Sequence, residues 1–343
     1  MAYTTINKSS EHFNTKLYTG NGGTQTISGI GFQPDFTWVK SRNYGYYHYL
    51  QDAVRGSSNV LYTNNNDAQA TGVTAGISAW NSDGYVTGSQ GALNGSGKTF
   101  AAWNWKANGT GSANTAGSIN STVSANTTAG FSIVSYTGTG ANATVGHGLS
   151  SAPSMIIVKG RNFVDNWCVF HSSLGGGKKL KLNITNGEIT TSESWNNTSP
   201  TSSVFSLGID GETNNNGSAM IAYCFADVQG YSKFSSYVGN GNADGTFVYT
   251  GFKPAFVITK RTDGVGNWLM YDTKRIGYNP SNYFLFPHLS NAEDTSNAQW
   301  LDLHSNGFKT RATSTTINGS GNSYIYMAFA EQPLVGDNPA TAR

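Results

Sequence analysis

Acidic residues are the first place to look for catalysis in this sequence. They form two loose groups, made of Glu188, Glu193, Asp210, Glu212, Glu293, Asp294 and Asp302. A glycosidase needs two carboxyl groups that face each other across the scissile bond. Because none of these acids recurs in a shared frame along the chain, the sequence predicts no catalytic residue and favours a protein that is not an enzyme.

Motifs for metals and nucleotides are equally weak. The histidines are dispersed, without a spacing such as H-E-x-x-H that would bring two ligands together. The stretch NADG at 242–245 could hold calcium, but turns of this composition are far more often plain turns. GALNGSGKT at 91–99 has Ala92 where a phosphate-binding loop requires glycine, and a strand pattern follows it. We therefore expect a hairpin turn at 91–99, and no metal or cofactor.

Basic side chains recur at one place in a repeated strand. The positions are Lys40, Lys159 and Lys260, with Arg42, Arg161 and Arg261 nearby. They could bind anionic groups, such as glycan phosphates or the carboxylates of a neighbouring subunit. They could instead solvate the exposed end of the strand and discourage edge pairing. The sequence favours the second interpretation.

Aromatic residues cluster twice. NYGYYHYL, which starts at Asn43, contains Tyr44, Tyr46, Tyr47 and His48, and a later stretch contains Tyr278, Tyr283 and His288. Sugars stack on exposed aromatic faces, so both stretches are candidate glycan contacts. Alternatively, half of each set belongs to the core and the rest to a contact between subunits. Both interpretations stay open.

Composition limits the class of protein. Charged residues are only 12% of the 343 residues and the net charge is +2, which argues against a nucleic-acid partner. Aromatics at 13% and 42 glycines suit strands joined by tight turns. No apolar run approaches the roughly 20 residues of a membrane helix, and the N-terminus lacks an export-signal pattern. Cys168 and Cys224 lie in apolar runs and are expected to be buried thiols, with a single bridge as the alternative.

The chain repeats itself three times. YTGNG, YTGTG and YVGNG begin at Tyr18, Tyr136 and Tyr237, and GFQPDFTWVK, GLSSAPSMIIVK and GFKPAFVITK follow in the same order. These central strands are apolar on both faces, which predicts a position inside a sheet. Farther along, Gly84, Gly208 and Gly307 are expected to occupy a turn that needs positive φ.

The last strand of each repeat predicts a sandwich. FAAWNWK, MIAYCFA and YIYMAFA place bulky apolar residues at every second position, as in Trp103, Tyr223 and Met327. Period two indicates one buried face, and the smaller residues between them suggest an outer face. Short strands with frequent turns favour an all-β fold of three tandem antiparallel β-sandwich domains of one repeated type, jelly-roll or lectin-like.

The expected boundaries follow from these repeats. They are an N-terminal docking segment at 1–17, repeats at 18–107, 131–229 and 230–332, a polar linker at 108–130 and a tail at 333–343. The linker is rich in Gly, Ser, Thr and Asn and is expected to be flexible, with at most one short strand at 119–123. Stacked domains would form a stiff rod or plate.

Several long phrases resemble a known family. INKSSEHFNTKLYTGNG, STVSANTTAGFSIVSYTGTGANATVGHGL, FADVQGYSKFSSYVGNGNADGTFVYTGFKPAFVITKR and AFAEQPLVGDNPATAR are similar to a repeat domain of virion proteins from tailed, especially marine, bacteriophages. The resemblance covers nearly the whole chain. It implies a structural or tail-fibre-like protein of the virion, assembled in the cytoplasm of the host bacterium, and it brings no catalytic residues.

Three functions remain after the resemblance. The leading expectation is a non-enzymatic tail fibre or adsorption component that binds host-surface glycan. A capsid decoration protein, such as a cement protein or head fibre, is the alternative, and a polysaccharide depolymerase is third. The expected partners are other virion proteins, copies of the same chain (a trimer is favoured) and host-surface polysaccharide, without nucleic acid or membrane insertion.

Overall fold

The regular secondary structure is almost entirely antiparallel β-sheet. The structure is a computed structural model that describes residues 4–276, 279–280, 283–296, 300–335 and 339. Strands account for 42% of it and helices for 3%, so the expected all-β class is confirmed. No helix in the described part of the chain is long and apolar enough to cross a membrane.

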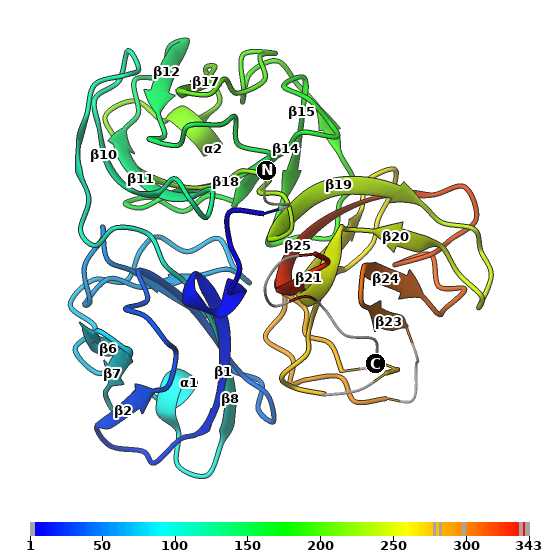
Figure 1. The fold of residues 1–343 in the computed structure, drawn as a ribbon. Helices are drawn as coiled ribbons and strands as arrows, with labels where there is room; N and C mark the ends of the chain where they lie inside the picture. The colour runs from blue at the N-terminus through cyan, green and yellow to red at the C-terminus, as the bar shows by residue number, and fades with distance from the viewer. Residues whose placement is uncertain (1–3, 277–278, 281–282, 297–299, 336–338, 340–343) are drawn as a thin grey trace.

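Three lobes surround a common centre (Figure 1). The large sheet of the first lobe has the order β1-β8-β3-β4-β5, and its small sheet has the order β2-β7-β6. The bounds are β1 (Phe13–Thr19), β2 (Gln25–Ser28), β3 (Phe36–Ser41), β4 (Tyr49–Asp52), β5 (Leu61–Tyr62), β6 (Ile77–Asn81), β7 (Gly84–Thr87) and β8 (Thr99–Trp105), with 3-10 turn η1 (Ser9–Glu11) and helix α1 (Gly91–Asn94).

The second lobe has the longest sheet, with the order β16-β15-β14-β13-β18-β11-β10-β9, and a small sheet of β12 and β17. The bounds are β9 (Ser112–Asn114), β10 (Ser121–Asn126), β11 (Phe131–Thr137), β12 (Ala143–Gly146), β13 (Met155–Gly160), β14 (Cys168–His171), β15 (Lys178–Lys181), β16 (Ile189–Thr190), β17 (Val204–Leu207) and β18 (Ala219–Phe225), with helix α2 (Gly211–Asn214).

The third lobe has a large sheet in the order β19-β25-β21-β22 and a small sheet in the order β20-β24-β23. The bounds are β19 (Ser232–Val238), β20 (Phe247–Tyr249), β21 (Phe252–Arg261), β22 (Trp268–Asp272), β23 (Leu301–His304), β24 (Gly307–Thr310) and β25 (Ser323–Pro333). In each large sheet the last strand of the lobe (β8, β18 or β25) lies between the strand that contains the repeated tyrosine (β1, β11 or β19) and the strand with the repeated lysine.

Both faces of these last strands are buried, so the expected outer face was wrong. In β8, Ala101, Trp103 and Trp105 belong to a core that the three lobes share. Phe100 and Ala102 point the other way, into the first lobe's own core beneath its small sheet. The small residues of the intervening columns therefore mark close packing between two sheets rather than contact with water.

The shared core is predominantly aromatic. The ring of Trp105 lies 4.7 Å from that of Phe13 in its own lobe, measured between centroids. It also lies 6.2 Å from Phe225 of the second lobe and 5.6 Å from Phe329 of the third. Because one cluster joins all three large sheets, the lobes surround a centre and do not stack into the expected rod or plate.

Two of the expected boundary segments are part of the sheets. The segment 108–130, expected to be a flexible linker, contributes β9 and β10, and β10 pairs with β11 along six residues. The segment 1–17, expected to be a docking segment, contributes Ile6 and Phe13 to the shared core. Apolar residues at single positions in otherwise polar stretches carry these contacts, which composition alone does not reveal.

A buried asparagine explains the repeated Tyr-x-Gly-x-Gly signature. Asn94 accepts a hydrogen bond from the N–H of Asn21 (2.9 Å) and donates to the carbonyl of Gly23 (2.6 Å). Asn214 and Asn318 bind the corresponding turns of the other lobes in the same way. Gly20 must lack a side chain, because a Cβ there would lie 2.4 Å from a carbonyl oxygen.

The turns around these asparagines differ in two details from expectation. Residues 91–94 form the helical turn α1, so the strand β8 follows a helical turn and not a hairpin. Gly208 and Gly307 do not adopt positive φ; a Cβ at either would approach a carbonyl oxygen to about 2 Å. Close approach of the backbone, rather than a left-handed turn, requires glycine there.

Replacing Trp105 by Ala is expected to lower the free energy of unfolding by about 3–5 kcal/mol, because a large buried ring is lost. Calorimetry should show one transition that moves to lower temperature as a whole, since the shared core couples the lobes. Tyr249→Ala is the control, because that ring is 57% exposed. Two transitions of which only one moves would contradict the coupling.

Candidate functional site

The recurrent lysines are buried, and neither expected role for them was right. Lys40, Lys159 and Lys260 are each 0% exposed. Lys159 Nζ donates to the carbonyl of Asn66 in the first lobe (3.3 Å), and Lys260 Nζ donates to that of Thr185 in the second (3.1 Å). Lys159 and Lys260 therefore bind backbone carbonyls across junctions between lobes, whereas Lys40 binds carbonyls of its own lobe.

The junctions share one backbone hydrogen bond, which closes a ring of lobes. Gln69 N–H donates to the carbonyl of Arg161, Glu188 N–H to that of Thr262, and Glu293 N–H to that of Arg42, each at 2.7 Å. The first bond joins lobes one and two, the second joins two and three, and the third joins three and one. Sequence-distant segments are thus held in the same way at every junction.

The recurrent arginines are not equivalent. Arg42 Nε contacts Glu293 of the third lobe at 2.6 Å, and Arg161 Nε contacts Gln69 of the first at 3.0 Å. Arg261 instead pairs with Asp263 in its own lobe at 2.7 Å. The position that matches Arg42 and Arg161 at the third junction is Thr262, one residue farther along.

Lys40 also fixes the tyrosine-rich loop. Its ammonium donates to the carbonyls of Ser41 (2.8 Å) and Tyr44 (3.0 Å). Asn43 accepts a hydrogen bond from the N–H of Thr99, and Tyr46 N–H donates to the carbonyl of Tyr44. Held on both sides, the loop between β3 and β4 presents its rings outward: Tyr44 is 47% exposed and Tyr47 is 48% exposed.

Tyr46 and Tyr47 of this loop line a small open cavity, which we call the tyrosine pocket. It has a volume of about 250 Å³ and is lined by Gly45, Tyr46, Tyr47, Tyr49, Tyr62, Gln90 and Ala92. The rings of Tyr47 and Tyr49 each lie 5.5 Å from that of Tyr62, edge to face. Next to the pocket, the ring of Tyr44 lies 4.5 Å from that of Tyr46 in a tilted arrangement, and the ammonium of Lys98 lies over the Tyr44 ring at 4.4 Å.

The predicted aromatic contacts divide into three groups. Tyr44, Tyr46 and Tyr47 come together at the surface as predicted. His48 and His288 are buried, so they cannot meet a ligand from solvent; Trp38 Nε1 donates to His48 Nδ1 at 2.9 Å. Tyr283 is partly exposed, away from the pocket, and Tyr278 lies outside the described residues.

Sequence reasoning missed Tyr49, Tyr62 and Gln90. Tyr62 reaches the pocket because β5 pairs with β4, which sets it opposite Tyr49. Gln90 precedes α1 and comes from the far end of the lobe. The strand pattern marks Tyr62 as a strand residue, but no sequence signal brings residues 13 and 41 positions away next to Tyr49.

In the second lobe, ion-paired side chains fill the place that corresponds to the tyrosine pocket. Lys179 Nζ contacts Asp210 Oδ2 at 2.5 Å and Glu212 Oε2 at 2.8 Å, and Lys181 contacts Glu212 at 2.5 Å. Burial opposes the charged form of Glu212, but these hydrogen bonds outweigh it and lower its pKa. Cys168 lies within 4.8 Å of both acids, yet the Lys179 ammonium already occupies the position that a metal cation would need.

Most of the remaining acids considered for catalysis are paired with cations. Glu188 contacts Lys178, Glu293 contacts Arg42, and Asp302 contacts Arg311. Asp294 caps the N–H of Ser296, and Glu193 is exposed. In NADG, Asp244 contacts Lys309 and Arg311, so its carboxylate is bound by cationic side chains. Both cysteines are buried and free, as expected.

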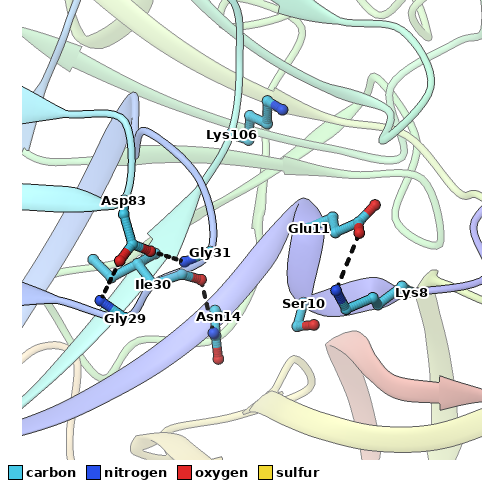
Figure 2. A pocket seen from close by; sticks show the side chains of 9 residues that line it. All are labelled: Lys8, Ser10, Glu11, Asn14, Gly29, Ile30, Gly31, Asp83 and Lys106. Carbon is cyan, nitrogen blue, oxygen red and sulfur yellow. Dashed lines mark hydrogen bonds and ion pairs between the residues drawn. The ribbon is translucent and has the colours of Figure 1, made fainter.

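A polar cavity of about 320 Å³ lies between η1 and the turn at Gly29–Gly31 (Figure 2). The Asp83 carboxylate accepts from the N–H groups of Gly29 (2.9 Å) and Gly31 (2.7 Å). These bonds lower the pKa of Asp83 and hold two glycines at positive φ. Lys8 pairs with Glu11 on the η1 side of the cavity at 3.2 Å. The charged groups of this cavity that are described here thus stabilise the turn and η1. The tyrosine pocket is therefore the better candidate site.

One protein family matches the same part of the chain that forms the three lobes. A family described as a domain of unknown function, DUF7483, matches residues 8–333. The chain therefore belongs to this family, and the match covers all three lobes. No curated protein matches the chain.

The buried lysines predict how stability depends on pH. Burial lowers the pKa of Lys40 and Lys260 to about 7 and that of Lys159 to about 8. An unfolded lysine keeps its proton up to about pH 10.4, so the unfolded state binds more protons between pH 7 and 10. The free energy of unfolding is therefore expected to rise with pH across this window and to fall as pH returns to 7.

Lys40→Met should reduce the slope of the free energy of unfolding against pH by about a third. Urea unfolding at pH 7, 8 and 9 measures this slope. Lys8→Met is the matched control, because the Lys8 side chain is 63% exposed. An unchanged slope in Lys40→Met would show that this amine does not titrate as its burial requires.

Proposed function

We propose that the chain is a non-enzymatic structural protein of a bacteriophage virion, a tail-fibre or adsorption component that binds host-surface glycan through the tyrosine pocket. The pocket carries the proposal: exposed rings converge on an open cavity, held there by a buried lysine. Sugar rings pack their apolar faces on aromatic side chains, while a few polar groups orient the hydroxyls. The phage assignment rests on the sequence resemblance.

The proposed architecture is three fused copies of one β-sandwich domain, jelly-roll or lectin-like. The matching strand orders of the large sheets and the repeated junction bond support it. In this view the chain supplies by itself the threefold arrangement that separate subunits would otherwise make. Association with further copies and with other virion proteins stays a prediction.

A binding role suits the acids better than a hydrolytic one. Asp210 and Glu212 are bridged by Lys179, and the hydrogen bonds lower the pKa of both despite burial. A general acid in a glycosidase needs the opposite shift, toward a raised pKa. A depolymerase is therefore the weakest of the three functions, and release of reducing ends from host polysaccharide would restore it.

Capsid decoration is the second candidate, and the threefold arrangement favours it. A body with three similar lobes can contact three neighbouring capsid subunits in similar ways. Cryo-EM of intact particles separates the two functions. Density at the tail supports adsorption, whereas density over the capsid lattice would make the tyrosine-rich loop a contact between proteins.

Tyr47→Ala is expected to weaken binding of the protein to host cells or their purified polysaccharide by roughly tenfold. The lost stacking surface is worth about 1.4 kcal/mol on that estimate. Surface plasmon resonance on immobilised polysaccharide measures the change. Tyr249→Ala is the control, because that exposed ring lies on β20 of the third lobe. Equal binding by the wild type and Tyr47→Ala would remove the pocket from the proposal.

A further inference from the structure

We propose that the tyrosine pocket selects an uncharged sugar ring, and that it discriminates against glycans built from acidic sugars. This rests on the glycan-binding function proposed above and adds the class of ligand. Its basis is a comparison of equivalent positions in the first and second lobes. Uncharged residues occupy these positions in the first lobe, and charged residues occupy them in the second.

The pocket is lined by groups without charge. Its side chains are four tyrosines, Gln90 and Ala92. Gln90 can both donate and accept hydrogen bonds, which suits a sugar hydroxyl. The Tyr49 hydroxyl is buried beside Gln90 and Tyr62, so Gln90 and the rings of Tyr46 and Tyr47 are the groups that a ligand would meet first.

Two charged side chains of opposite sign, Lys98 and Asp67, lie beside rings of the tyrosine-rich region but outside the pocket lining. The ammonium of Lys98 covers the ring of Tyr44, and Asp67 lies on the side of Tyr62 and accepts a hydrogen bond from Asn65. Neither provides a buried partner for a carboxylate in the pocket. An acidic sugar would therefore lose hydration without gaining a counter-charge, which is unfavourable.

The second lobe shows what a charged version of this place looks like. Tyr49 and Cys168 begin β4 and β14, and each is paired with the last residue of the next strand, Tyr62 or Lys181. Gln90 and Asp210 stand in the same position immediately before the helical turns α1 and α2. The pocket positions of the first lobe thus correspond to ionic positions in the second.

The ionic version is closed by its own contacts. Asp210 and Glu212 are held by Lys179, and Glu212 is also held by Lys181 and Asn166. Ala92 stands where the second lobe has Glu212, and no ion pair closes the space above Tyr62. The open tyrosine pocket and the closed ionic cluster are therefore two solutions for one place in the fold, and only the first leaves room for a ligand.

The size of the cavity limits what enters it. At about 250 Å³ it is smaller than the roughly 300–1,000 Å³ of pockets that enclose whole drug-sized ligands. It suits a single sugar ring, with the rest of the chain in solvent. One neutral residue of a longer polysaccharide would thus be recognised.

The test compares neutral and acidic probes on the full-length protein. Hexasaccharides of glucose, galactose and mannose are titrated by calorimetry beside hexamers of galacturonate and mannuronate. We expect at least one neutral hexasaccharide to bind at least tenfold more tightly than either acidic hexamer, and Tyr47→Ala to lose that binding. Acidic hexamers that bind equally or better, and lose binding in Tyr47→Ala, would overturn the selectivity but leave the glycan function standing. Absence of binding by every probe and by host polysaccharide would overturn both.

A charge graft makes the test independent of probe choice. Tyr62→Lys combined with Ala92→Glu places in the pocket the pair that Lys181 and Glu212 form in the second lobe. The graft is expected to reduce neutral-sugar or host-polysaccharide binding at least tenfold. The same two charges placed on exposed residues of the third lobe, Tyr249→Lys combined with Val238→Glu, should leave binding within about threefold of the wild type, because both side chains are 57% exposed and neither lines the pocket. Circular dichroism and thermal unfolding check that each variant is folded. A graft that is folded and binds as tightly as the wild type would refute the proposal.

Discussion

The contact among aromatic rings at the centre of the molecule is the constraint on which the rest of the structure depends. Phe13, Trp105, Phe225 and Phe329 bring three sheets together, and each sheet must therefore be apolar on both faces. This explains why charged residues are only 12% of the chain. It also leaves the central strands of the large sheets without an exposed face, so exposed rings occur in loops and on the small sheets.

Two buried ion pairs at the edge of this core each accept a hydrogen bond from a neighbouring lobe. Asp52 and Arg55 form an ion pair with no exposure, and Asp52 also accepts from the hydroxyl of Tyr223. Asp272 and Arg275 form the corresponding pair, which accepts from Trp103. At the remaining junction, Met327 stands in the position of Tyr223 and Trp103, and its side chain cannot donate a hydrogen bond. His171 and Leu174 stand there in place of the Asp–Arg ion pair. Buried charge thus occurs where a donor faces it, as the cost of desolvation requires.

The sequence predicted the elements better than their arrangement. The lysine-terminated strands, the buried last strands and the all-β class follow from local patterns, because period and residue type depend on near neighbours. The shared core was missed because the same apolar columns fit either two packed sheets or three sheets around one centre. Tyr44, Tyr46 and Tyr47 were found because they are adjacent in sequence. Tyr62 and Gln90 were not, because pairing of distant strands brings them to the pocket. His48 was misplaced because tyrosine and histidine alternate between surface and core within one loop.

The matched places in the first and second lobes determine valency. In an assembly of three identical chains, a site present once per chain is present three times, and every change to it is made three times. In this chain each lobe has its own sequence. Ala92 in the first lobe and Glu212 in the second can therefore differ, although they occupy equivalent positions. One threefold body can then keep these positions open in the first lobe while the second lobe uses them for internal ion pairs. Strong attachment would require many copies of the body, each contributing one weak contact.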